Sequence, residues 1–107
     1  MKKYSVFILL LFCYSVSYSQ NSKIDSLLAL LKTDKEDTGK ITHLTSLSRR
    51  YNDIGEFKKS LPYSKQALEL SQKIGFKYGI TKSYNSIGII YMLQSNYPEA
   101  LKNFSSG

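Results

Sequence analysis

Apolar residues recur at helical spacing along most of the chain after residue 20. Within residues 21–32 they fall at i, i+3, i+4 and i+7, which is the stripe of an amphipathic helix. A polar connection, residues 33–38, follows this helix. Apolar residues with the same period then predict further helices over residues 39–54, 57–74, 79–94 and from 97 onward. The pattern therefore predicts an all-α chain whose helices are joined by short turns.

Two residues are unusual for the interior of a helix. Pro62 lies about five positions into the segment 57–74, where it removes an N–H and should clash with the carbonyl of Lys58. This helix must therefore either start late or bend at Pro62, and we expect a bend because the apolar pattern continues on both sides of the proline. Gly88 lies in the middle of the segment 79–94, where glycine weakens a helix by roughly 1 kcal/mol relative to alanine. Its missing side chain is explained if another helix must approach closely.

The segment from residue 81 to residue 104 has a counterpart forty residues upstream. In chain order, Leu44, Leu47, Ser48 and Tyr51 take the places of Tyr84, Ile87, Gly88 and Tyr91, and Gly55, Phe57 and Leu61 take those of Ser95, Tyr97 and Leu101. Recurrence in register indicates a repeated pair of helices.

The pattern aromatic-x2-aliphatic-Gly-x2-Tyr, followed by Ala-x3-Phe, resembles the tetratricopeptide repeat, a helix–turn–helix unit. The resemblance covers residues 41–107 and departs from the family at Ser48 for the glycine, Ser60 for the first alanine and Ser64 for a large aromatic residue. The period is about six residues longer than usual, which is similar to the longer bacterial and partner-scaffold variety of these repeats.

The resemblance implies antiparallel helix–turn–helix repeats stacked as an α-solenoid, of which this chain looks like a truncated array. Residues 20–40 would be a leading helix with its connection, residues 41–80 one repeat and residues 81–107 part of a second. The implied repeat-core residues are Leu44, Leu47, Tyr51, Gly55, Phe57, Ala67, Tyr84, Ile87, Gly88, Tyr91, Tyr97, Ala100 and Phe104.

The first 19 residues have the order of a secretory signal peptide: a cationic start, an apolar stretch and a small polar end. The apolar stretch has about ten residues and a membrane span needs about 20, which favours cleavage after Ser19 over an uncleaved anchor. A lipoprotein cut before Cys13 is disfavoured because Phe12 is bulky where a small residue is needed. We therefore expect export to the periplasm or the extracellular space of a bacterium, with membrane contact only through export or a downstream span.

Composition and motifs favour binding over catalysis. Cleavage lowers the net charge from +7 to +5 by removing Lys2 and Lys3, and it removes the single cysteine. The remaining basic residues are dispersed among acidic and neutral ones, which argues against nucleic-acid binding. His43 has no cysteine or second histidine near it, so we expect a bystander on the surface. No serine, glycine or carboxylate pattern indicates a catalytic, metal or cofactor site.

In stacked helical pairs the first helix of each pair lines the concave side. By resemblance, the partner-binding residues would be Thr42, Thr45, Arg49 and Asn52 of the first pair and Lys82, Asn85, Ile89 and Met92 of the second. Asn85 matches the asparagine with which long repeats often hold a target's backbone. Arg49 and Lys82 could bind a carboxylate, which would suit an acidic peptide, although the family's full carboxylate clamp is not present.

We therefore expect a non-catalytic, exported interaction module that binds a peptide, a partner protein or adjacent repeats of its own parent chain. The alternative is the extracytoplasmic sensor segment of a longer signal-transduction protein, a histidine kinase or a helix-turn-helix regulator. It is suggested by residues 30–42, which resemble the opening of exported bacterial proteins of this family.

Overall fold

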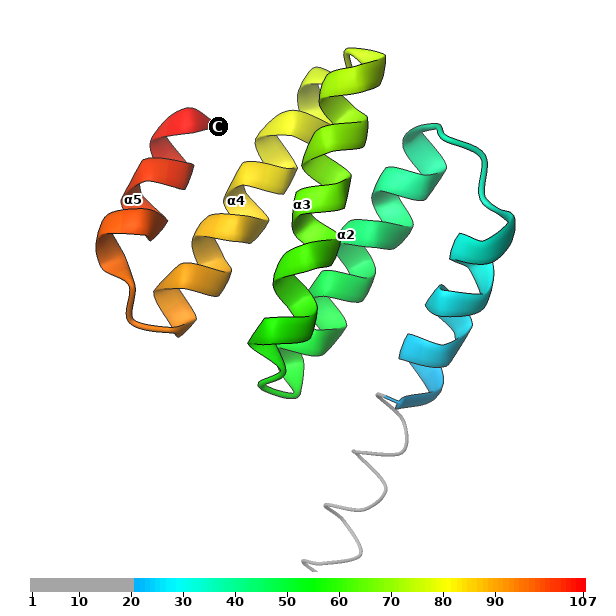
Figure 1. Ribbon diagram of the computed structural model, residues 1–107, viewed down its shortest axis with the longest axis horizontal. Coiled ribbons are helices and arrows are strands. Elements are labelled where there is room, and N and C mark those ends of the chain that lie inside the picture. The colour runs from blue at the N-terminus through cyan, green and yellow to red at the C-terminus, as the bar shows by residue number, and fades with distance from the viewer. Residues whose placement is uncertain (1–20) are drawn as a thin grey trace, which may run out of the picture.

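The computed structural model describes residues 21–107, in which each helix lies against the next one along the chain (Figure 1). A first helix covers residues 21–33. The others are α2 (Thr38–Asp53), α3 (Phe57–Ile74), α4 (Lys77–Leu93) and α5 (Tyr97–Ser106). Besides these neighbour contacts, α2 also touches α4. Within the described part the chain is all-helical, as predicted; the predicted signal peptide and its cleavage site lie outside it.

Helix ends fall within two residues of their predicted positions, and local capping groups define two of them. Asp37 begins α2, since its carboxylate accepts a hydrogen bond from the N–H of Lys40 at 3.2 Å. Gly75, with a φ of 69°, ends α3 in the left-handed conformation. The next helix then starts at Lys77, two residues earlier than predicted, and Gly79 lies in its first turn. A Cβ on Gly79 would collide with the side chain of Ser71, so this glycine lets α4 approach α3 closely.

Of the two possibilities for the helix around Pro62, a late start and a bend, the late start does not occur. The helix begins at Phe57 and runs through Pro62. Both Pro62 and Lys58 are exposed. The carbonyl of Lys58, which loses its intrahelical bond to the proline, is therefore at the surface, where water can replace that bond.

The two turns of the repeated pairs correspond at the level of backbone hydrogen bonds. Gly55 and Ser95 both have positive φ, 75° and 61°. Their backbone N–H groups make the same hydrogen bond: that of Gly55 donates to the carbonyl of Asn52 at 3.0 Å, and that of Ser95 donates to the carbonyl of Met92 at 3.0 Å. The following N–H groups bond to the carbonyls of Tyr51 and Tyr91, both at 2.8 Å. The forty-residue offset read from the sequence is therefore also a structural correspondence between α2–α3 and α4–α5.

The predicted core residues differ in burial. The buried ones are Leu44, Leu47, Ala67, Ile87, Gly88 and Ala100, and the partly buried ones are Tyr51, Phe57, Tyr84 and Tyr91. Gly55 is exposed in its turn. A core place for Tyr97 is wrong in the described structure: its side chain is 63% exposed, because it starts α5, which packs on α4 alone. Phe104 is 38% exposed at the same edge, although its ring contacts α4.

Gly88 is a point of close approach, as predicted. A Cβ at this position would lie 2.6 Å from Cε1 of Phe104, well inside van der Waals contact. In the first pair, Ser48 replaces the glycine and Ser64 replaces the phenylalanine. The two serine hydroxyls are 2.5 Å apart. The same crossing is therefore packed by an aromatic ring over a glycine in one pair and by two small hydroxyls in the other.

The aromatic residue of the first pair stands one position earlier along the chain. Tyr63 stacks on Tyr51, with ring centroids 5.7 Å apart and planes 6° from parallel. Burial, and then the nearby Tyr63, Asp25 and Glu56, raise the pKa of Tyr51 above its usual value. The folded chain therefore favours the neutral phenol.

Replacing Gly88 by leucine is expected to destabilise the fold by about 1–3 kcal/mol or more, because the new side chain would overpack the site that the Phe104 ring occupies. Thermal unfolding followed by circular dichroism measures the effect. The matched control is Gly88→Leu in a Phe104→Ala background, where room for the leucine exists and the penalty should shrink. An equal penalty in both backgrounds would show that Phe104 does not set the available space.

The raised pKa of Tyr51 predicts a loss of stability in alkali. An acid whose pKa is raised by folding stabilises the fold fully below its unfolded value, near 10, and that contribution is lost as pH rises through the folded value. We expect the free energy of unfolding to fall above about pH 10, and to fall less in Tyr51→Phe. Urea unfolding of both proteins across this range is the measurement. Identical alkaline losses would contradict the assignment to Tyr51.

Candidate functional site

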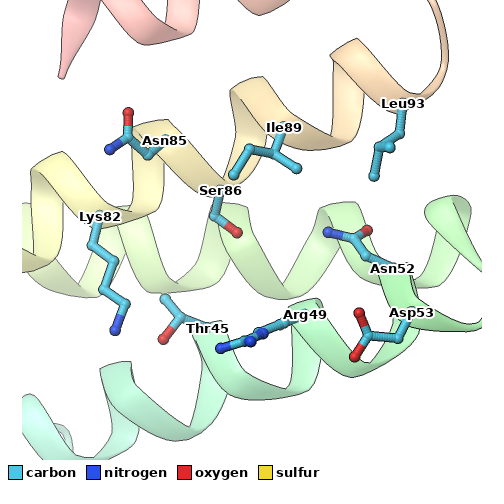
Figure 2. Close-up of a pocket in the computed structure, with 9 residues that line it drawn as sticks. All are labelled: Thr45, Arg49, Asn52, Asp53, Lys82, Asn85, Ser86, Ile89 and Leu93. Carbon is cyan, nitrogen blue, oxygen red and sulfur yellow. The ribbon is translucent and has the colours of Figure 1, made fainter.

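A hollow of about 560 Å³ lies between α2 and α4, and we call it the α2–α4 hollow (Figure 2). It is lined by Thr45, Arg49, Asn52, Asp53, Lys82, Asn85, Ser86, Ile89 and Leu93. Six of the eight residues expected on the concave side are in this set. Thr42 and Met92 are not in it, and both are exposed. The structure therefore brings most of the predicted residues to one place.

Helical spacing explains how two helices fill one hollow. Thr45, Arg49 and Asp53 follow one another at intervals of four residues and so share a face of α2. Lys82, Ile89 and Leu93, at intervals of seven and four residues, share a face of α4. Figure 2 shows both sets in the same order along the hollow, with Lys82 and Thr45 at one end and Leu93 and Asp53 at the other. Sequence reasoning missed Asp53, Ser86 and Leu93. Asp53 and Leu93 correspond to each other at the forty-residue offset. Each lies four residues after a predicted site residue, Arg49 or Ile89, so helical spacing could have found both.

The charges in the α2–α4 hollow are unevenly distributed. Arg49 forms no ion pair within residues 21–107, and Lys82 holds its ammonium 5.8 Å from the ring centroid of Tyr78. At the far end, Asp53 lies 3.9 Å from the guanidinium of Arg50. Ile89 and Leu93, 41% and 49% exposed, supply apolar surface between and beside these groups. An anion is therefore favoured at one end and an apolar group at the other.

The floor of the hollow is connected to a buried serine cluster (Ser48, Ser60, Ser64 and Ser86). The hydroxyl of Ser60 donates to the carbonyl of Ser48 at 2.8 Å. Each hydroxyl has one proton, so Ser48 Oγ must be the donor in its 2.8 Å bond to Ser60 Oγ. Ser64 then donates to Ser48, and Ser86 donates to Ser64 at 2.8 Å. The proton of Ser86 is thus committed inward, and the hollow meets its oxygen as an acceptor.

Asn52 contributes a polar atom without a partner. Its Oδ1 is buried and accepts no hydrogen bond from any described residue. The other asparagine in the lining, Asn85 of α4, is exposed. A buried acceptor left unpaired costs on the order of 1–3 kcal/mol, so the unpaired Oδ1 of Asn52 lowers the stability of the fold.

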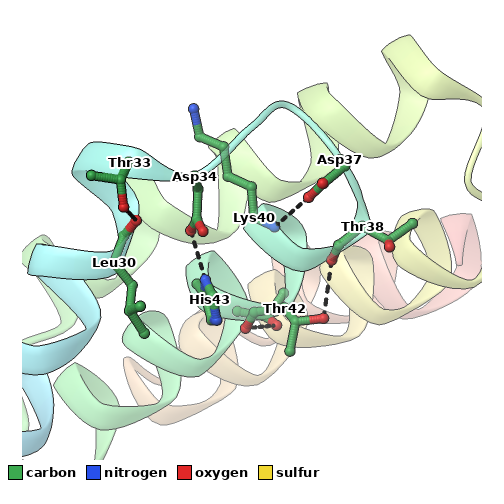
Figure 3. Close-up of polar contacts among 9 residues, drawn as sticks. Leu30, Thr33, Asp34, Asp37, Thr38, Lys40, Thr42 and His43 are labelled. Atoms are coloured by element: carbon green, nitrogen blue, oxygen red, sulfur yellow. Dashed lines mark hydrogen bonds and ion pairs between the residues drawn. The ribbon is translucent and has the colours of Figure 1, made fainter.

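His43 is not the bystander that the sequence suggested. Its Nδ1 lies 2.6 Å from Oδ2 of Asp34, across the connection between the first helix and α2 (Figure 3). Lys73 of α3 ties the same connection through a 2.8 Å bond to Glu36, and this bond lowers the pKa of the Glu36 carboxyl. No hydroxyl nucleophile within residues 21–107 is hydrogen-bonded to the imidazole. The histidine therefore anchors a connection, and sequence reasoning missed it because its partner lies nine residues away across a turn.

Two further findings concern the described residues. They contain no group of three His, Cys, Asp or Glu side chains that could hold a metal ion. None of the helices in this part of the chain combines the length and the apolar character that crossing a membrane requires.

Comparisons with protein-family models, with curated proteins and with solved structures returned no match. The functional proposal therefore rests on the side chains of the α2–α4 hollow and on their geometry.

The unpaired amide of Asn52 predicts an unusual mutational effect. We expect Asn52→Leu to be neutral or to stabilise the fold by up to about 1–3 kcal/mol, because it removes a buried acceptor without changing the side-chain shape much. Urea unfolding gives the free-energy change. Asn85→Leu is the matched control, since it makes the same replacement at an exposed helical position. A larger loss of stability for Asn52→Leu than for the control would show that the Asn52 amide is hydrogen-bonded in the folded protein.

Proposed function

We propose that this chain is a non-catalytic protein-interaction module of the tetratricopeptide type, which binds a peptide or a segment of a partner protein in the α2–α4 hollow. The observation that carries the proposal is the lining of this hollow, where six residues expected to bind a partner come together. In this proposal α2–α3 and α4–α5 are successive units of an α-solenoid. Their matching turn hydrogen bonds support that arrangement.

The chemistry of the hollow favours an acidic segment with an apolar neighbour. Arg49 and Lys82 would bind a carboxylate, and charge-assisted hydrogen bonds are about twice as strong as neutral ones. Leu93 and Ile89 would contact the apolar side chain of the same segment. Ser86 offers an acceptor that suits a backbone N–H group. An extended or helical peptide supplies all these groups together.

The cellular location proposed for the module rests on the sequence alone. The order of residues 1–19 supports export, which would place the hollow outside the cytoplasm, in contact with exported or extracellular partners.

Reversing the charge at Arg49 and Lys82 together is expected to weaken binding of acidic peptides at least tenfold, since a lost charged hydrogen bond is worth about 1.5–3 kcal/mol. A panel of synthetic peptides that combine Glu with Leu, and the same peptides with Lys in place of Glu, would be titrated by fluorescence anisotropy. Arg49→Glu with Lys82→Glu should lose the preference for the acidic set while keeping its helical circular dichroism.

The matched control is Lys58→Glu with Lys77→Glu, which changes the net charge equally at two exposed lysines outside the hollow. This control should bind as the unmodified chain does. Equal losses in both double variants would mean that only overall charge matters, and unchanged binding in the first would remove Arg49 and Lys82 from the site.

A further inference from the structure

A second hollow of about 420 Å³ lies between α3, α4 and α5 and shares no residue with the α2–α4 hollow. Tyr84 and Tyr91 of α4 line it, together with Asn103 of α5. Charged residues of both signs surround it, Lys65 and Glu69 from α3 and Glu99 and Lys102 from α5. We call it the Tyr91 hollow.

The equivalent place in the first helical pair is filled. Tyr91 corresponds to Tyr51, and Asn103 corresponds to Tyr63, by the offset that the two turns confirm. There the Tyr63 ring stacks on Tyr51, and it packs against the buried apolar core. In the second pair, the amide of Asn103 donates to the carbonyl of Glu99 at 2.8 Å instead. Within residues 21–107 the Tyr91 ring has no stacked partner.

A shift of one residue explains why the space is open. The first pair reads Tyr63 then Ser64, whereas the second reads Asn103 then Phe104. Consecutive residues of a helix point about 100° apart, so the ring of Phe104 reaches Gly88 and not Tyr91. The aromatic side chain of α5 therefore fills the notch on α4 and leaves the Tyr91 ring without a stacked partner.

We propose that the Tyr91 hollow is a binding site for an aromatic side chain of a partner protein, which would lie against Tyr91 as Tyr63 lies against Tyr51. The chain itself identifies the occupant, because it builds the same place twice and fills one copy with a phenol ring. Stacked aromatic pairs are favourable beyond the area they bury. Lysine and glutamate side chains on both sides suit an aromatic anchor flanked by polar residues. The site is separate from the α2–α4 hollow and does not depend on the function proposed for that surface.

The test titrates the full chain with N-acetyl-tyrosinamide and, as the non-aromatic reference, N-acetyl-leucinamide, following assigned backbone amide signals of α4 and α5 by NMR. A single side chain binds weakly, in the millimolar range. We expect the tyrosine probe to bind at least tenfold more tightly than the leucine probe. Asn103→Tyr should weaken the tyrosine probe at least tenfold, because its own ring would occupy the hollow. Asn103→Gln, which adds no ring, should bind the probe as the unmodified chain does.

Three further measurements complete the test. Tyr63→Asn should open the equivalent place beside Tyr51 and add a second set of perturbed signals in α2 and α3; this variant decides the question if Asn103→Tyr does not fold. Arg49→Glu with Lys82→Glu should leave the tyrosine probe unaffected, which separates the two sites. Equal binding of the two probes, undiminished binding by folded Asn103→Tyr, or no second site in Tyr63→Asn would each overturn the proposal.

Discussion

Close approach of neighbouring helices through small residues is the constraint on which the rest of the structure depends. Gly88 faces the ring of Phe104, Gly79 faces Ser71, and Ser48 faces Ser60 and Ser64. At each place a larger side chain would force the helices apart. α3 packs against both α2 and α4, so the small residues at its crossings set how closely the two helices that line the hollow can lie.

The two helical pairs meet this constraint by different chemistry. The second pair covers a glycine with an aromatic ring, which contributes apolar contact. The first pair uses serines, and buried hydroxyls cost free energy unless each finds a partner. The serine cluster satisfies all its members, so polarity at this crossing is tolerated. Tyr63 then supplies, one position away, the aromatic contact that the serines lack. The first pair therefore has its aromatic side chain at position 63 and a serine at position 64, whereas the second pair has its aromatic side chain at the equivalent of position 64.

Periodicity and capping residues were sufficient to predict the helices, because both act within a few neighbouring residues. The same local reasoning located Gly88 as a contact point, whereas the six predicted residues of the α2–α4 hollow came from the resemblance to the tetratricopeptide repeat. It could not predict that three departures from the repeat pattern, Ser48, Ser60 and Ser64, would bond to one another, since each departure alone reads as a loss. Nor could it predict the pairing of His43 with Asp34 or the exposure of Tyr97, which depend on where separate elements come to rest.

The direction of the hydrogen bonds in the serine cluster determines how the Ser86 hydroxyl is oriented in the α2–α4 hollow. The bond from Ser60 to the carbonyl of Ser48 is the only one in the cluster whose direction is fixed by its acceptor, and the other hydroxyls orient in sequence from it. An alanine at Ser60 would remove this fixed point, and the remaining protons could reverse together. Ser86 could then turn its proton outward, so the polarity of the Ser86 hydroxyl in the hollow is governed by a side chain on α3 that does not line the hollow.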